Sequence, residues 1–173
     1  TAEDAAYATL TFKNGAVGQY IEDHAGHGQG VWARQIYGSR GSMTLPSDRS
    51  GGNITLHLEG QAIIEDQKIL DLVPDFQLDD ITTRLFGGNR LWRYQFPFPE
   101  TDRKIIAIEY ADFAEAIFGQ HQVEVNAEQG TRSVAASYSM MESHQIGRLV
   151  TLEEVITEQV DSYQEEINDS LGL

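Results

Sequence analysis

A strand–turn–strand pattern near the start of the chain constrains the fold more than any other feature. Apolar and more polar residues alternate along residues 6–12, which is the period-two pattern of a half-buried β-strand. Asn14-Gly15 follows, and this dipeptide favours the positive φ angles of a type I′ hairpin turn. Across such a turn Phe12 would lie opposite Val17. The sequence therefore predicts an antiparallel hairpin whose two strands share one apolar face.

The rest of the chain divides into a strand-rich first half and a helical second half. Alternation predicts further strands over residues 31–37, 43–45, 54–58 and 92–98. Helical spacing and capping signals predict a short helix over residues 78–85, a helix over 106–117, one between Asn126 and Gly147, and a last one from Thr151 through Ile167. Strands followed by helices predict an α+β fold, a mostly antiparallel open sheet with its helices packed on one face. We expect residues 1–173 to form a single domain.

Composition excludes several classes of function. The chain has 27 acidic and 12 basic residues, and its net charge of −15 should repel both nucleic acids and anionic membranes. It has no cysteine, which excludes disulfides and thiolate metal sites. No apolar run approaches the roughly 18 residues that a membrane span requires. No signal-peptide pattern is visible. We therefore expect a cytoplasmic protein.

The chain lacks the pattern that binds a dinucleotide. Such a site needs G-x-G-x-x-G between a strand and a helix, so that the helix N-terminus faces the pyrophosphate. The nearest match, Gly26-His27-Gly28-Gln29-Gly30, lies between two predicted strands. We interpret it as a hairpin loop. The chain alone is expected to bind neither NAD nor NADP.

The same loop carries the densest polar cluster. His24 and His27 with a nearby carboxylate are ligand types that zinc accepts. However, H-x-x-H on a glycine loop fixes no common geometry and no third ligand is evident, so no metal site is predicted. Two interpretations stay open: the histidines are incidental surface residues, or they hydrogen-bond a polar substrate.

A second candidate feature is the aromatic row that begins at Trp92 and recurs at positions 94, 96 and 98. Such a row is typical of a core or a subunit interface, which is the interpretation we favour. Its alternative role is a platform on which a sugar ring stacks.

Several segments, taken in order, resemble one enzyme family. They are the strand–Asn14-Gly15–strand unit, Ile36-Tyr37-Gly38-Ser39-Arg40-Gly41, Asp112-Phe113 with Ala116-Ile117, and Glu142-Ser143 with Gly147-Arg148. Their order and spacing resemble the C-terminal half of the glucose–fructose oxidoreductase / inositol dehydrogenase-like (Gfo/Idh/MocA) family. The resemblance covers nearly the whole chain and is weakest between about Leu58 and Arg103.

The resemblance implies that this chain works with an N-terminal Rossmann domain of the same enzyme. That domain would bind NAD or NADP and would carry the family's catalytic residues, so none is assigned here. The loop before the strand at Ile36 is similar to one that faces substrate in inositol dehydrogenase-like members. We therefore select His24, His27, Gln29 and Trp92 as candidate substrate contacts.

The function implied is that of a substrate-binding and oligomerisation domain. The full enzyme would be an NAD(P)-dependent oxidoreductase acting on a sugar, polyol or similar hydroxylated small molecule, and this chain alone would be inactive. We expect a homo-oligomer that forms through the open sheet face. Two alternatives remain: a stand-alone binding or assembly module of the same fold, and an independent α+β enzyme such as a metal-assisted isomerase.

Overall fold

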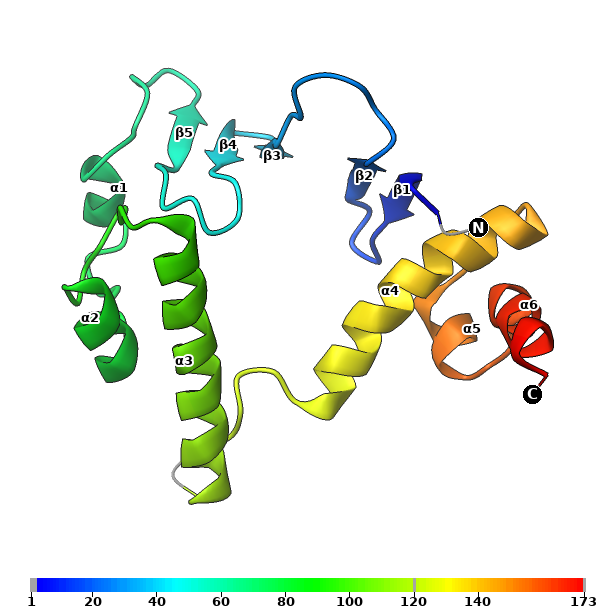
Figure 1. Ribbon diagram of the computed structural model, residues 1–173. Helices are drawn as coiled ribbons and strands as arrows, with labels where there is room; N and C mark the ends of the chain where they lie inside the picture. The colour runs from blue at the N-terminus through cyan, green and yellow to red at the C-terminus, as the bar shows by residue number, and fades with distance from the viewer. Residues whose placement is uncertain (1–2, 120, 173) are drawn as a thin grey trace. The chain divides into compact units, whose positions relative to one another are not determined.

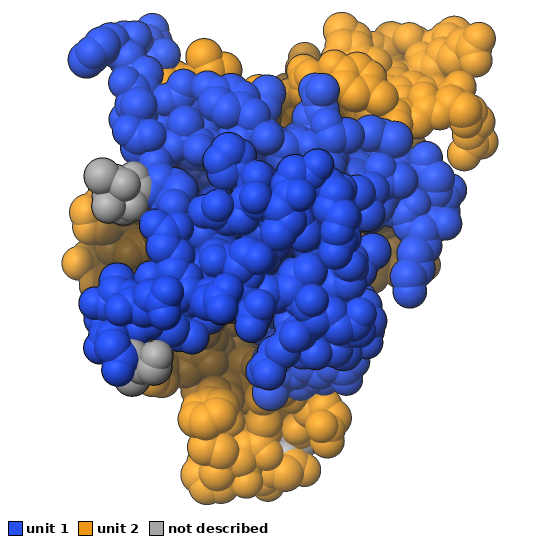
Figure 2. All heavy atoms as spheres, turned by 90° about the vertical axis from the view of Figure 1, so that its right-hand side faces the viewer, with its two compact units in different colours: residues 1–29, 124–173 blue, residues 30–123 orange. Residues whose placement is uncertain are grey.

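The structure, a computed structural model, describes residues 3–119 and 121–172. It divides into two compact units, which Figure 2 colours blue and orange. The first unit combines Thr1–Gln29 with Glu124–Leu173, and the second is Gly30–Val123. Each unit has its own antiparallel sheet and its own helices (Figure 1).

The first unit opens with the predicted hairpin, but the register differs from the prediction by one residue. Strands β1 (Ala5–Thr11) and β2 (Val17–Asp23) pair so that Thr11, not Phe12, faces Val17. The Phe12 N–H donates to the Ala16 carbonyl at 2.9 Å, which leaves a three-residue loop. A type I′ turn would require a positive φ at both Asn14 and Gly15. Gly15 has a φ of 84°, but the φ of Asn14 is not positive. A three-residue loop with a left-handed glycine therefore replaces the expected two-residue turn.

The register decides which side chains share a face of the hairpin. Ala6, Ala8 and Leu10 are half-buried, as the alternation predicts. Tyr7 pairs directly with Ile21, and both are about two-thirds exposed, at 66% and 68%. The outer face of the hairpin is therefore open to solvent and mixes these apolar side chains with polar ones such as the Thr9–Gln19 pair.

The helices of the first unit are α4 (Ala127–Ile146), α5 (Leu152–Ile156) and α6 (Ser162–Leu171). The capping box at the start of α4 is confirmed, because Asn126 and Gln129 exchange side-chain and backbone hydrogen bonds of 2.9 Å. The single last helix expected after Thr151 is wrong. The helix is interrupted between α5 and α6, where Glu158 adopts a positive φ of 55° that a right-handed helix does not accommodate.

A buried carboxylate holds α6 against α4. Glu142 is 2% exposed and accepts a hydrogen bond of 2.9 Å from the Tyr163 N–H in the first turn of α6. The Tyr163 ring packs edge-on against Tyr138, and its hydroxyl donates to Glu3 at 2.8 Å. Glu142 therefore serves as a distant cap for a helix whose own N-cap residue makes no side-chain bond.

The second unit contains strands β3 (Arg34–Gly38), β4 (Gly41–Leu45) and β5 (Thr55–Leu58), paired antiparallel in that order. Its helices are α1 (Lys68–Asp71), α2 (Asp80–Phe86) and α3 (Phe98–Ile117). In Figure 1, β4 and β5 lie above the upper end of α3. In the first unit, β1 and β2 lie above part of α4. The α+β class with antiparallel strands is confirmed, in the form of two small sheets.

The strand expected over residues 92–98 is wrong. Residues 92–97 form no strand, and their backbone makes a 3.2 Å bond from the Tyr94 N–H to the Gly51 carbonyl. Pro97 is the N-cap of α3 and Phe98 its first residue. Proline lacks the N–H that a strand must donate, but its fixed φ suits the start of a helix. Tyr94 and Phe96 pack with Phe86 of α2 instead, at ring-centroid distances of 4.9 and 5.7 Å.

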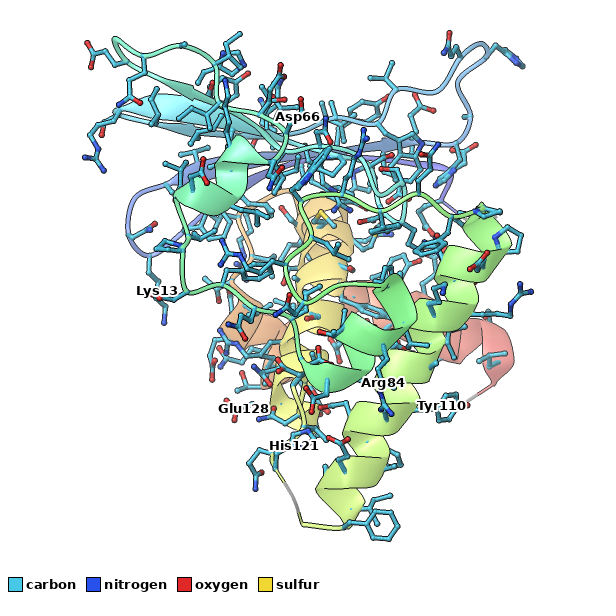
Figure 3. The ribbon with its side chains drawn as sticks, turned by 90° about the vertical axis from the view of Figure 1, so that its left-hand side faces the viewer. Lys13, Asp66, Arg84, Tyr110, His121 and Glu128 are labelled. Atoms are coloured by element: carbon cyan, nitrogen blue, oxygen red, sulfur yellow. The ribbon has the colours of Figure 1, made fainter. Side chains whose placement is uncertain are left out.

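The apolar stripe that predicts α3 is largely open to solvent within the second unit. Ile106, Tyr110, Phe113 and Ile117 are 44%, 73%, 60% and 67% exposed. Figure 3 shows Tyr110 projecting from the side of the helix. The helical spacing therefore predicts the element correctly, although this face is not its buried one.

Candidate functional site

The loop of residues 24–29, which follows β2, is organised by the carboxylate of Asp23. Asp23 Oδ1 accepts hydrogen bonds from the N–H groups of Ala25 at 3.0 Å and Gly26 at 2.8 Å. Its second oxygen accepts from the Tyr7 hydroxyl at 2.6 Å. These hydrogen bonds lower the pKa of Asp23, and the bond from Tyr7 contributes most, followed by the bond from the Gly26 N–H. The start of the loop is therefore fixed by a carboxylate that stays ionised at neutral pH.

His24 is oriented by the neighbouring carboxylate. Its Nε2 lies 2.8 Å from Glu22 Oε1, and the Tyr20 hydroxyl also donates to Glu22. Both hydrogen bonds lower the pKa of Glu22, and the bond from Tyr20 contributes more than the bond from His24. Because an ionised carboxylate can only accept, the His24 Nε2 carries a proton. A histidine that donates through Nε2 has Nδ1 as its acceptor nitrogen in the neutral tautomer, and that nitrogen suits a substrate hydroxyl.

The other two loop candidates, His27 and Gln29, are solvent-exposed like His24. All three lie in the same loop of the first unit, as the sequence order requires. Trp92 lies in the second unit. Within the described residues, no group of three or more His, Asp or Glu side chains is arranged to hold a metal ion.

Trp92 lines an open cavity of about 490 Å³, and all of its lining residues belong to the second unit. Its walls come from the β4–β5 loop, from α2 and α3, and from the segment before α3. They comprise Arg34, Leu45–Arg49, Gly51, Gly52, Ile54, Leu78, Thr82, Phe86, Leu91–Tyr94, Ile105 and Ile108. This volume is in the range of small-molecule sites, and a mostly apolar lining with a few polar groups is typical of them.

One wall of the cavity depends on the close approach of two backbone segments. Gly51 is buried with a φ of 66°, and a Cβ built on it would lie 2.2 Å from the Tyr94 carbonyl oxygen. Only glycine fits this contact. The contact fixes the segment that carries Trp92 and Tyr94 against the β4–β5 loop.

The charged lining residues are mainly arginines. Arg34 forms an ion pair with Asp48 across the loop. Arg49 donates to Asp102 at 2.6 Å and lies 4.8 Å from the Phe98 ring centroid. Arg93 is exposed and stacks over Trp92, with its guanidinium carbon 4.3 Å from the ring centroid. The cavity therefore combines aromatic surface with fixed guanidinium groups.

Sequence reasoning identified Trp92 but missed the arginines and the glycine around it. The signal available was the run Arg90-Leu91-Trp92-Arg93-Tyr94, in which cations alternate with aromatic and apolar residues. Interpreting residues 92–98 as a strand placed Arg93 on the face opposite the aromatic row and left Arg90 outside the strand. Arg90 instead reaches inward and donates to the carbonyl oxygens of Leu70 at 2.9 Å and Phe76 at 2.8 Å.

The described residues include no helix that combines the length and apolar character needed to cross a membrane. Comparisons with curated proteins and with solved structures gave no match. The family model described as "Oxidoreductase family, C-terminal alpha/beta domain" matches residues 1–152 of the 173. The match includes both hairpin strands, the loop of residues 24–29, the cavity and α4, and it ends at the first residue of α5. The chain therefore belongs to the Gfo/Idh/MocA oxidoreductase family and represents its C-terminal domain.

Proposed function

We propose that this chain is the substrate-binding and oligomerisation domain of an NAD(P)-dependent oxidoreductase that acts on a sugar, polyol or similar hydroxylated small molecule. The observation that carries the proposal is the family match over residues 1–152. We further propose that residues 1–173 work as one C-terminal domain, with an N-terminal Rossmann domain of the same protein as the partner.

The residues of this chain do not fit a dinucleotide, so we derive no step through the cofactor. Gly26–Gly30 is followed by the irregular residues 31–33 and then β3, and a strand provides no N-terminal dipole for a pyrophosphate. NAD or NADP would supply the hydride chemistry from the Rossmann domain, while the protein orients the substrate.

The role proposed for the chain is to bind and orient hydroxyl groups. His24 offers Nδ1 as an acceptor because Glu22 holds its other nitrogen. His27 and Gln29 add polar groups on the same loop, and Trp92 offers an aromatic face on which a sugar ring can stack.

Steady-state kinetics of the whole protein tests this proposal. NAD and NADP are each supplied with a panel of sugars and polyols, and turnover with at least one pair is expected. Replacing His24 or Trp92 by Ala should raise KM, whereas the exposed strand residue His57, replaced by Ala, serves as the control. Absence of NAD(P)-linked turnover with every compound would favour the non-catalytic binding module instead.

The oligomerisation role is supported by three exposed apolar side chains on the outer face of the hairpin, Tyr7, Val17 and Ile21, at 66–68% exposure. Exposed apolar patches mark interaction surfaces, and closed symmetric homo-oligomers are the common result. Light scattering of the whole protein should show an oligomer that Ile21→Lys weakens. Ile63→Lys, at an apolar residue that is also exposed but lies outside this face, should not. A monomeric parent protein would contradict the proposal.

A further inference from the structure

The cavity around Trp92 has a charge opposite to that of the chain. Its lining contains three arginines, Arg34, Arg49 and Arg93, and one acid, Asp48. The whole chain has 12 basic and 27 acidic residues. A quarter of the basic residues therefore surround one cavity in a strongly acidic protein, and such a concentration favours a negatively charged ligand locally.

The three arginines differ in how their charge is used. Arg34 and Arg49 are paired with Asp48 and Asp102, so their charges are largely compensated inside the protein. Arg93 makes no ion pair with a described carboxylate, and its guanidinium rests on the Trp92 ring. The ring contact leaves the N–H groups of this exposed guanidinium without a described hydrogen-bond acceptor, and guanidinium N–H groups recognise carboxylates and phosphates.

Apolar and aromatic groups complete the cavity beside this cation. Phe86 and Tyr94 line it and pack edge to face at 4.9 Å. Thr82 lines the α2 side, and its hydroxyl donates to Asp79 at 2.5 Å. This combination suits a molecule that has a carbon ring or chain with hydroxyl groups and one anionic end.

We propose that the cavity selects an anionic form of the hydroxylated substrate, a sugar acid or a sugar phosphate, through the Arg93 guanidinium. This inference rests on the proposed function, because it names the substrate class of the same protein. The anion lies against the outer edge of Arg93, and the carbon skeleton lies along Trp92 and Tyr94. The paired arginines do not bind the anion directly, because Asp48 and Asp102 already hold them.

Calorimetric titration of the whole protein, without nicotinamide cofactor, tests the inference. The probes are gluconate, glucose 6-phosphate and neutral glucose. At least one anionic probe should bind about tenfold or more tightly than glucose, the usual advantage of a charge-assisted hydrogen bond. Whichever anionic probe binds identifies the carboxylate or the phosphate as the recognised group. Equal binding of glucose, or no binding of either anion, would overturn the inference.

Variants assign the effect to Arg93. Arg93→Gln should remove the preference for the anion, and Arg93→Lys should keep part of it, because lysine retains the charge but loses the planar stack. Arg132→Gln on α4 removes one positive charge outside the cavity and should leave the preference unchanged. Circular dichroism confirms that each variant is folded. An unchanged preference in Arg93→Gln contradicts the assignment.

The outcome is separable from that of the proposed function. If the whole protein oxidises neutral polyols with NAD(P) and binds no anion, the proposed function stands and this inference fails. If anionic sugars bind through Arg93 but no NAD(P)-linked turnover is found, the cavity assignment stands and the oxidoreductase proposal fails.

Discussion

Two loops of this molecule contain closely spaced glycines and use them in opposite ways. In the loop of residues 24–29, Gly28 has a φ of 118° and open space where a side chain would be. In the loop of residues 46–52, Gly51 is buried and touches the backbone of Tyr94. The first loop is held mainly by the carboxylate of Asp23, whereas the second is held by a segment more than 40 residues away along the chain.

The difference shows how a loop becomes part of a binding site. The loop of residues 24–29 keeps its polar side chains in solvent and is fixed at one end only, so it suits a role in contacting a ligand. The loop of residues 46–52 forms a rigid wall for the cavity beside Trp92. Each loop therefore has a separate role within its own unit.

The largest expected effect comes from Gly51→Ala. The added Cβ would overlap the Tyr94 carbonyl oxygen at 2.2 Å, and the positive φ disfavours any side chain. We expect a loss of about 3 kcal/mol in the free energy of unfolding, from backbone strain and overpacking together. Urea denaturation measures it. Gly26→Ala is the control, because its Cβ would meet Asp23 at an ordinary 3.5 Å, and a change above about 0.5 kcal/mol there would break the comparison.

Ser50→Ala should have a smaller effect on the same wall. The Ser50 hydroxyl donates to the Ser47 carbonyl at 2.7 Å and accepts from the Gly52 N–H at 3.3 Å. Losing these bonds on an exposed loop should lower the free energy of unfolding by about 0.5–1 kcal/mol. Weaker binding of the sugar probes should accompany it. Unchanged stability and binding would show that the Tyr94 contact alone holds this loop.

Asp23→Asn should act locally in the other loop. The amide retains one acceptor oxygen but loses the charge that binds two backbone N–H groups and the Tyr7 hydroxyl. We expect faster amide hydrogen exchange at Ala25 and Gly26 with little change in global unfolding. A large loss of global stability would show that this loop is as structural as the other.

The smallest effect is a pH dependence of the same loop. The pKa of Asp23 is lowered from its ordinary value of 3.8. Its hydrogen bonds are therefore fully present above about pH 4 and are lost as the pH falls through the lower folded-state value. The amide proton shifts of Ala25 and Gly26 should report this transition in an NMR titration. The same shifts in Asp23→Asn should stay flat, and a transition there would assign the effect to another group.

The elements predicted best are those whose signals are local. The Asn126 capping box, the end of α4 at Gly147 and the hairpin strands depend on neighbouring residues only, and the structure contains each of them. The errors arise where a distant contact or a single backbone angle decides. The one-residue register shift follows from the φ of Asn14, and the division of the last helix follows from Glu158.

The sequence by itself determined the α+β class, the family and the polar loop with His24, because alternation, caps and motif order are properties of adjacent residues. Only the tertiary structure decided that the segment from Trp92 is a cavity wall and not a strand. That outcome depends on the contact between Gly51 and Tyr94 and on the aromatic cluster with Phe86. Contacts between residues so far apart in sequence carry no periodic signal, because their energy comes from surfaces that meet only after the chain has folded.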